Sequence, residues 1–181
     1  MTNTSSAAPT MTTTSEAQDH LPFIYCDGSV RRHFSDQYGN GPPALAGIGI
    51  ARQVRLGVWE HECVPLWTQV NNYVVEMLAI ARAATLAASL LNRGGWAREV
   101  IIVSDCTFAI DEIWCHYHGV QAGRAEAQTA SAAIRNLVVA YGCNVKLHWV
   151  TRHANSDGIR RADHWAVVAA TTQRIDSSIT L

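Results

Sequence analysis

The spacing of apolar residues along the chain changes character near residue 74. Before this point, short apolar runs alternate with polar turn segments, a pattern that predicts strands at 22–27, 44–52 and 56–63, the last two forming a hairpin. After it, apolar side chains recur every three or four residues as far as Leu90, and Gly94-Gly95 follows. This second pattern predicts one long helix ended by the two glycines.

The rest of the chain alternates between the two patterns. The sequence predicts a buried strand at 99–104, helices at 106–117 and 124–141, a strand at 145–150 and a last amphipathic helix at 159–174. A hairpin that leads into strand–helix–strand units predicts an α/β fold with a mixed five-stranded sheet. Helices are expected on both faces of this sheet.

Outside the expected domain at 21–175, the chain lacks a hydrophobic period. Residues 1–20 are rich in Ser, Thr and Ala and are expected to be a disordered tail, and 176–181 a short C-terminal tail. A long polar loop is expected at 31–43. No apolar run approaches the roughly 20 residues that cross a bilayer, so no membrane partner is expected.

Composition adds two constraints. The formal net charge of −1 provides no overall basic field for nucleic acid, although every cation except Lys146 is arginine. Five cysteines without a Cys-x-x-Cys pair suggest reduced thiols in an intracellular compartment, the cytoplasm or nucleus. The tail contains no Arg or Lys and no apolar core, which argues against a transit peptide and against a secretory signal.

Four carboxylates occupy positions that invite a chemical explanation. Asp27 and Asp105 each close a predicted strand, and Glu76 and Asp163 lie near the starts of predicted helices. If the strands at 22–27 and 99–104 are parallel neighbours, their carboxyl ends meet at one edge of the sheet. Such a cluster repels itself unless cations occupy it, and oxygen ligands suit Mg²⁺ or Mn²⁺.

Each carboxylate also has a simpler explanation. Asp27-Gly28 is an ordinary turn signal, and Asp105 could cap the helix that follows it. Glu76 could be a favourable charge near a helix N-terminus, and Asp163 could pair with a neighbouring arginine. The functional interpretation therefore depends on the joint order of the four residues.

That order resembles the ribonuclease H family over about residues 22–174. Five segments carry the resemblance: 24–29 with Asp-Gly-Ser, 71–79 with Asn-Asn and then Glu76, 103–106 with Ser-Asp, 149–154 ending in His-Ala, and 161–163 with Arg-Ala-Asp. The interval from His153 to Asp163 is the most specific match. The resemblance implies a ribonuclease-H-like sheet with strand order 3-2-1-4-5.

The resemblance also implies an endonuclease that hydrolyses the RNA strand of RNA–DNA hybrids and leaves 5′-phosphate and 3′-hydroxyl ends. Asp27, Glu76, Asp105 and Asp163 would hold two Mg²⁺ ions, with Mn²⁺ as an alternative. His153 would assist proton transfer or product release. The groups that would read ribose 2′-hydroxyls belong to Gly28, Ser29, Asn71 and Asn72.

Other functions stay open at this point. The chain could be an inactive ribonuclease-H-like nucleic-acid-binding or connection module, or another nuclease built on the same sheet. Tyr73 follows the Asn pair where the family usually has Arg, and residues 117–124 contain Arg124 as their single fixed cation. Affinity for hybrid would then depend strongly on salt or come from a reverse-transcriptase-type partner.

Overall fold

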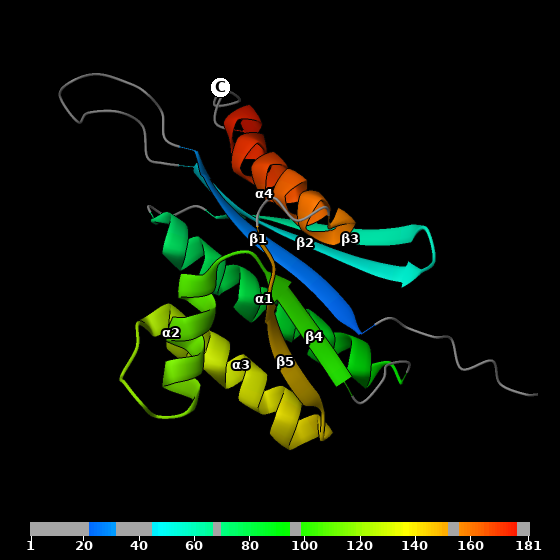
Figure 1. Ribbon diagram of the computed structural model, residues 1–181. Coiled ribbons are helices and arrows are strands. Elements are labelled where there is room, and N and C mark those ends of the chain that lie inside the picture. Colours follow the sequence, from blue (N-terminus) through cyan, green and yellow to red (C-terminus); the bar gives the residue numbers. More distant parts are fainter. Residues whose placement is uncertain (1–21, 32–44, 67–69, 95–98, 152–155, 177–181) are drawn as a thin grey trace, which may run out of the picture.

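The computed structural model describes residues 22–31, 45–66, 70–94, 99–151 and 156–176. Within these residues, five strands and four helices follow one another in the predicted order (Figure 1). The elements are β1 (Phe23–Arg31), β2 (Leu45–Arg55), β3 (Val58–Leu66), α1 (Asn72–Asn92), β4 (Glu99–Ser104), α2 (Thr107–Tyr117), α3 (Ala125–Tyr141), β5 (Asn144–Trp149) and α4 (Asp157–Asp176).

The strands form one mixed sheet in the order β3-β2-β1-β4-β5, which confirms the predicted fold. β1, β2 and β3 are antiparallel neighbours, whereas β4 runs parallel to β1 and β5 runs parallel to β4. α4 packs on β1, β2 and β3 (Figure 1). α1 packs on the other side of the sheet, and α3 packs against α1. Helices therefore cover both faces, as expected for parallel crossovers.

α1 is the core helix of the fold. Its buried side chains include Val75, Met77, Ile80 and a series of alanines, and they face β1, β2, β4 and α3. By length and composition alone, α1 is the one helix among the described residues that could cross a bilayer. Half of its apolar window is buried inside the protein, so packing in the core accounts for this composition.

Glycines in β2 allow α4 to lie directly on the sheet. A Cβ atom on Gly49 would lie 1.9 Å from the carbonyl oxygen of Ala162, and one on Gly47 would lie 2.4 Å from the amide nitrogen of Ala170. The facing residues of α4 are themselves small, so backbone packs against backbone. This close approach fixes the height of α4 above β1 and β2.

Several predicted boundaries were wrong, among them the ends of the two hairpin strands, which continue to Arg55 and Leu66. β1 does not end at Asp27 but continues through Gly28 and Ser29 to Arg31, because β2 pairs with it from Ile24 to Arg31. Leu56 belongs to the turn between β2 and β3, where Gly57 has a φ of 77°. α4 begins at Asp157, two residues earlier than predicted. Tertiary pairing overrides the local Asp-Gly turn signal in β1.

Several expectations concern residues outside the described ranges. These are the N-terminal tail, almost all of the loop at 31–43, and the C-terminal tail apart from Asp176. His153 also lies outside the described residues.

We predict that Gly49→Ala destabilises the protein by about 2 kcal/mol or more, because the added methyl group forces α4 away from the sheet. The free energy of unfolding from urea denaturation measures this effect. Gly57→Ala is the control: its Cβ meets open space, so it costs only the local strain of a positive φ. Equal losses in the two variants would contradict the close packing of α4.

Candidate metal centre

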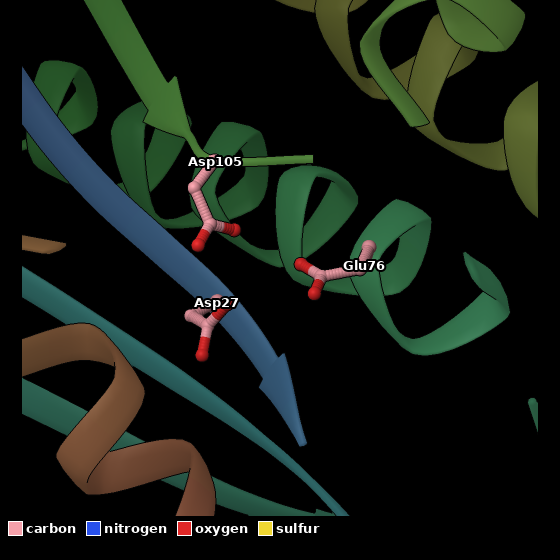
Figure 2. Close-up of side chains that lie close together, drawn as sticks. All are labelled: Asp27, Glu76 and Asp105. Atoms are coloured by element: carbon pink, nitrogen blue, oxygen red, sulfur yellow. The ribbon is translucent and has the colours of Figure 1, made fainter. Parts of the chain in front are cut away.

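Three of the predicted carboxylates converge in space. Carboxylate oxygens of Asp27, Glu76 and Asp105 lie within 4.8 Å of one another, although the residues come from β1, from α1 and from the turn after β4. Figure 2 shows Asp105 extending toward β1 while Glu76 reaches into the same space from α1. The structure thus brings together groups separated by about 30 to 80 residues of sequence.

The register of β1 and β4 explains why the two aspartates meet. Tyr25 pairs with Val103 in the parallel ladder, so Asp27 and Asp105 each stand two residues further along their strands. β4 ends at Ser104, and the ladder with β1 extends only as far as Tyr25. The two aspartates therefore flank the point where the strands separate, the position at which open sheets bind ligands.

The main chain of Gly28 holds the third carboxylate. Beyond the ladder with β4, the Gly28 amide donates a hydrogen bond of 3.1 Å to Oε2 of Glu76. A Cβ atom on Gly28 would lie 2.8 Å from the Glu76 amide nitrogen and 2.8 Å from the Val75 carbonyl carbon. Only glycine allows α1 to approach this closely, so Gly28 positions Glu76.

The electrostatic cost of this arrangement is large. Asp27 is 1% exposed, with both carboxylate oxygens closed off from solvent, and Glu76 is 8% exposed. Two unit charges about 4 Å apart repel by about 4 kcal/mol at an effective dielectric constant of about 20. A divalent cation among the three oxygen donors would reverse the sign of this interaction.

The same negative charges affect the pKa values of two neighbouring thiols, Cys26 and Cys106. Burial, followed by the charges of Glu76, Asp27 and Asp105, raises the pKa of Cys26 well above its usual value. Burial chiefly, with Glu76 and Asp105, also raises the pKa of Cys106, although N–H groups of the following helix lower it. Both thiols therefore stay protonated at neutral pH, and the donors left are hard oxygens that suit Mg²⁺ or Mn²⁺.

Asp163 is not part of this cluster. Its side chain is exposed on α4, and it is not among the three residues whose oxygens meet. Its predecessor Ala162 packs on Gly49, which stands opposite Asp27 in the β1–β2 register. Residues directly opposite each other in a sheet point to the same face, so α4 covers the face from which the Asp27 side chain projects.

The residues predicted to bind substrate differ in their contacts and in their exposure to solvent. Asn71 is the N-cap of α1, and its Oδ1 accepts a hydrogen bond of 2.9 Å from the Val74 amide. Asn72 is exposed in the first position of the helix, and Ser29 is half-buried in β1. A helix-capping role for Asn71 was not predicted, although an asparagine just before an apolar helix is a common cap signal.

Two of the simpler explanations fail. Asp27-Gly28 is part of β1 and not a turn. The N-cap of α2 is Cys106 and not Asp105, and the Cys106 side chain makes no capping hydrogen bond. Neither aspartate therefore occupies the turn or N-cap position that the simpler explanation assigned to it.

The fold and the acidic cluster define a ribonuclease-H-like protein. The family model described as RNase H matches residues 20–171, and the chain belongs to this family, as predicted from the sequence. No curated protein matches the chain in a sequence comparison.

Solved structures share the fold. The RNase H domain of PFV, determined in solution, is 14% identical and has a TM-score of 0.61, with 83% of this chain and 94% of that chain covered. RNase H1 from the archaeon Halobacterium salinarum NRC-1 is 19% identical, with a TM-score of 0.52 and coverage of 81% and 95%. LC11-RNase H1, solved in complex with RNA/DNA hybrid, is 19% identical, with a TM-score of 0.52 and coverage of 81% and 97%.

We predict that Gly28→Ala weakens Mn²⁺ binding by about 10-fold or more, because the added methyl group displaces Glu76 from the cluster. Calorimetric titration of the folded variant measures the dissociation constant. Gly57→Ala is the control, since its methyl group meets open space in the turn between β2 and β3 and leaves both α1 and α4 in place. Unchanged Mn²⁺ affinity in folded Gly28→Ala would refute the positioning role of Gly28.

Proposed function

We propose that this protein is a metal-dependent endonuclease that hydrolyses the RNA strand of RNA–DNA hybrids. Membership of the RNase H family supports the reaction class. One observation carries the proposal for this chain: carboxylates from three separate elements meet at the strand ends, largely buried, with oxygens as the available donors. A binding module without chemistry has no use for a cluster that costs folding free energy.

The proposed metal ligands are Asp27, Glu76, Asp105 and Asp163. Two bound Mg²⁺ or Mn²⁺ ions would supply an activated water and stabilise the departing 3′ oxygen. Asp27, Glu76 and Asp105 are already close enough to share an ion. Asp163 would complete the site from the exposed surface of α4, which lies over the same face of β1.

The remaining roles are assigned to residues around this cluster. We assign His153, which precedes α4 in the chain, to proton transfer or product release. Ser29, Asn71 and Asn72 stand near the ends of β1 and α1 and are assigned to the 2′-hydroxyl groups of the RNA strand. The Gly28 amide is hydrogen bonded to Glu76. Gly28 is therefore proposed to support substrate binding mainly by holding Glu76 in place.

Affinity for the hybrid is proposed to come in part from a reverse-transcriptase-type partner. Arg124, the cation in the region 117–124, pairs with Glu112 at 3.4 Å and lies over the Phe108 ring. Its charge is therefore partly neutralised by Glu112 and is less available to the phosphates of the hybrid. The foamy viral protease-reverse transcriptase, solved in complex with RNA/DNA hybrid, shares the fold, and this chain covers 22% of that chain.

A cleavage assay tests the function. We expect Mg²⁺- or Mn²⁺-dependent cutting of the labelled RNA strand in a hybrid, and none in duplex DNA or duplex RNA. Asp105→Asn should reduce the rate by more than about 100-fold, because it removes a metal ligand while preserving shape. It should also raise the melting temperature of the metal-free protein by a few degrees (roughly 2–4 °C per kcal/mol), because it removes a repulsive charge.

Asp111→Asn is the matched control, because Asp111 is an exposed aspartate on α2 outside the acidic cluster. It should leave the rate unchanged. Binding of hybrid without cutting by the wild-type protein would support an inactive module instead. Cutting of duplex DNA would indicate another nuclease of this fold.

A further inference from the structure

Trp149 connects the edge of the sheet to the acidic cluster. It is the last residue of β5, which borders the sheet beside β4, and it pairs with Ser104 in the ladder. Its indole Nε1 donates a hydrogen bond of 3.1 Å to the main-chain carbonyl oxygen of Asp105. The side chain thus reaches across the end of β4 to the residue that carries one of the clustered carboxylates.

Packing in the core does not explain this residue. The Trp149 side chain is 46% exposed, and it is not among the described residues that form the hydrophobic core or pack against it. A large aromatic residue with nearly half of its surface in solvent gains less from burial than it would in the core. Its donor, by contrast, has a specific partner with good geometry.

The main chain at this point is held on both sides of Asp105. The Val150 amide donates to the Ser104 carbonyl oxygen at 3.1 Å, and the Cys106 amide donates to the Ser104 hydroxyl oxygen at 3.1 Å. The bond from Trp149 ends on the carbonyl of Asp105 itself. Together these bonds set the orientation of the peptide planes around Asp105, and hence the direction in which its carboxylate projects.

We propose that Trp149 is a positioning residue for the metal centre, which fixes the Asp105 main chain so that the carboxylate meets those of Asp27 and Glu76. The inference depends on the proposed function, since it takes Asp105 to be a metal ligand. Metal sites tolerate displacements of only about 0.5 Å in their ligands, so a hydrogen bond to the ligand's own backbone affects ion affinity. Trp149 itself touches neither ion nor substrate in this proposal.

Trp149→Phe tests the inference, because it removes the donor and keeps an aromatic ring. We expect the Mn²⁺ dissociation constant, measured by calorimetry without nucleic acid, to rise about 10-fold. The Mn²⁺ concentration for half-maximal hybrid cleavage should rise by the same factor, with the rate at saturating Mn²⁺ nearly preserved. Trp114→Phe is the matched control: Trp114 is 41% exposed on α2, and its ring contacts Tyr117 and His118.

A second variant covers the case in which Trp149→Phe does not fold. Benzothienylalanine placed at position 149 keeps the shape of the bicyclic ring and replaces only the N–H group with sulfur. Wild-type Mn²⁺ affinity in either folded variant, or an equal loss in Trp114→Phe, would overturn the positioning role alone. If the wild-type protein binds no Mn²⁺, the proposed function fails as well.

Discussion

Mutual repulsion among Asp27, Glu76 and Asp105 is the constraint on which the rest of the structure depends. Their oxygens lie within 4.8 Å of one another, and two of the three residues are almost fully buried. The fold holds them there through the parallel register of β1 with β4 and through the close approach of α1 to Gly28. The repulsion lowers the stability of the metal-free fold at this point of the sheet, and the three oxygen donors are of the kind that hard divalent cations prefer.

Glycines in the sheet allow the two helices nearest the cluster, α1 and α4, to approach it closely. Gly28 permits contact between β1 and the start of α1, and Gly47 and Gly49 permit contact between β2 and α4. Backbone contact leaves little freedom for a helix to slide or tilt. The carboxylate of Glu76 and the backbone of Asp163 are therefore located by glycines that carry no functional group of their own.

Much of this arrangement was predictable from the sequence, because the relevant signals are local or motif-based. The periods of the apolar residues gave the order of the elements, and the family resemblance gave the sheet order and the acidic residues, of which three converge. Local signals failed where tertiary pairing decides: the turn signal at Asp27-Gly28 is overridden by the pairing of β1 with β2. Periodicity also could not show that the Trp149 indole reaches Asp105 or that the Gly28 amide binds Glu76, since both contacts join distant segments.

A crystal structure of the protein grown with Mn²⁺, with anomalous diffraction data, tests the central claim most directly. The account predicts an anomalous peak bounded by Asp27, Glu76 and Asp105, with oxygens of all three within about 2 Å of an ion. It also predicts that the Asp163 side chain turns from the surface of α4 toward a second peak. An empty cluster with its carboxylates turned apart, at a Mn²⁺ concentration that supports cleavage, would contradict it.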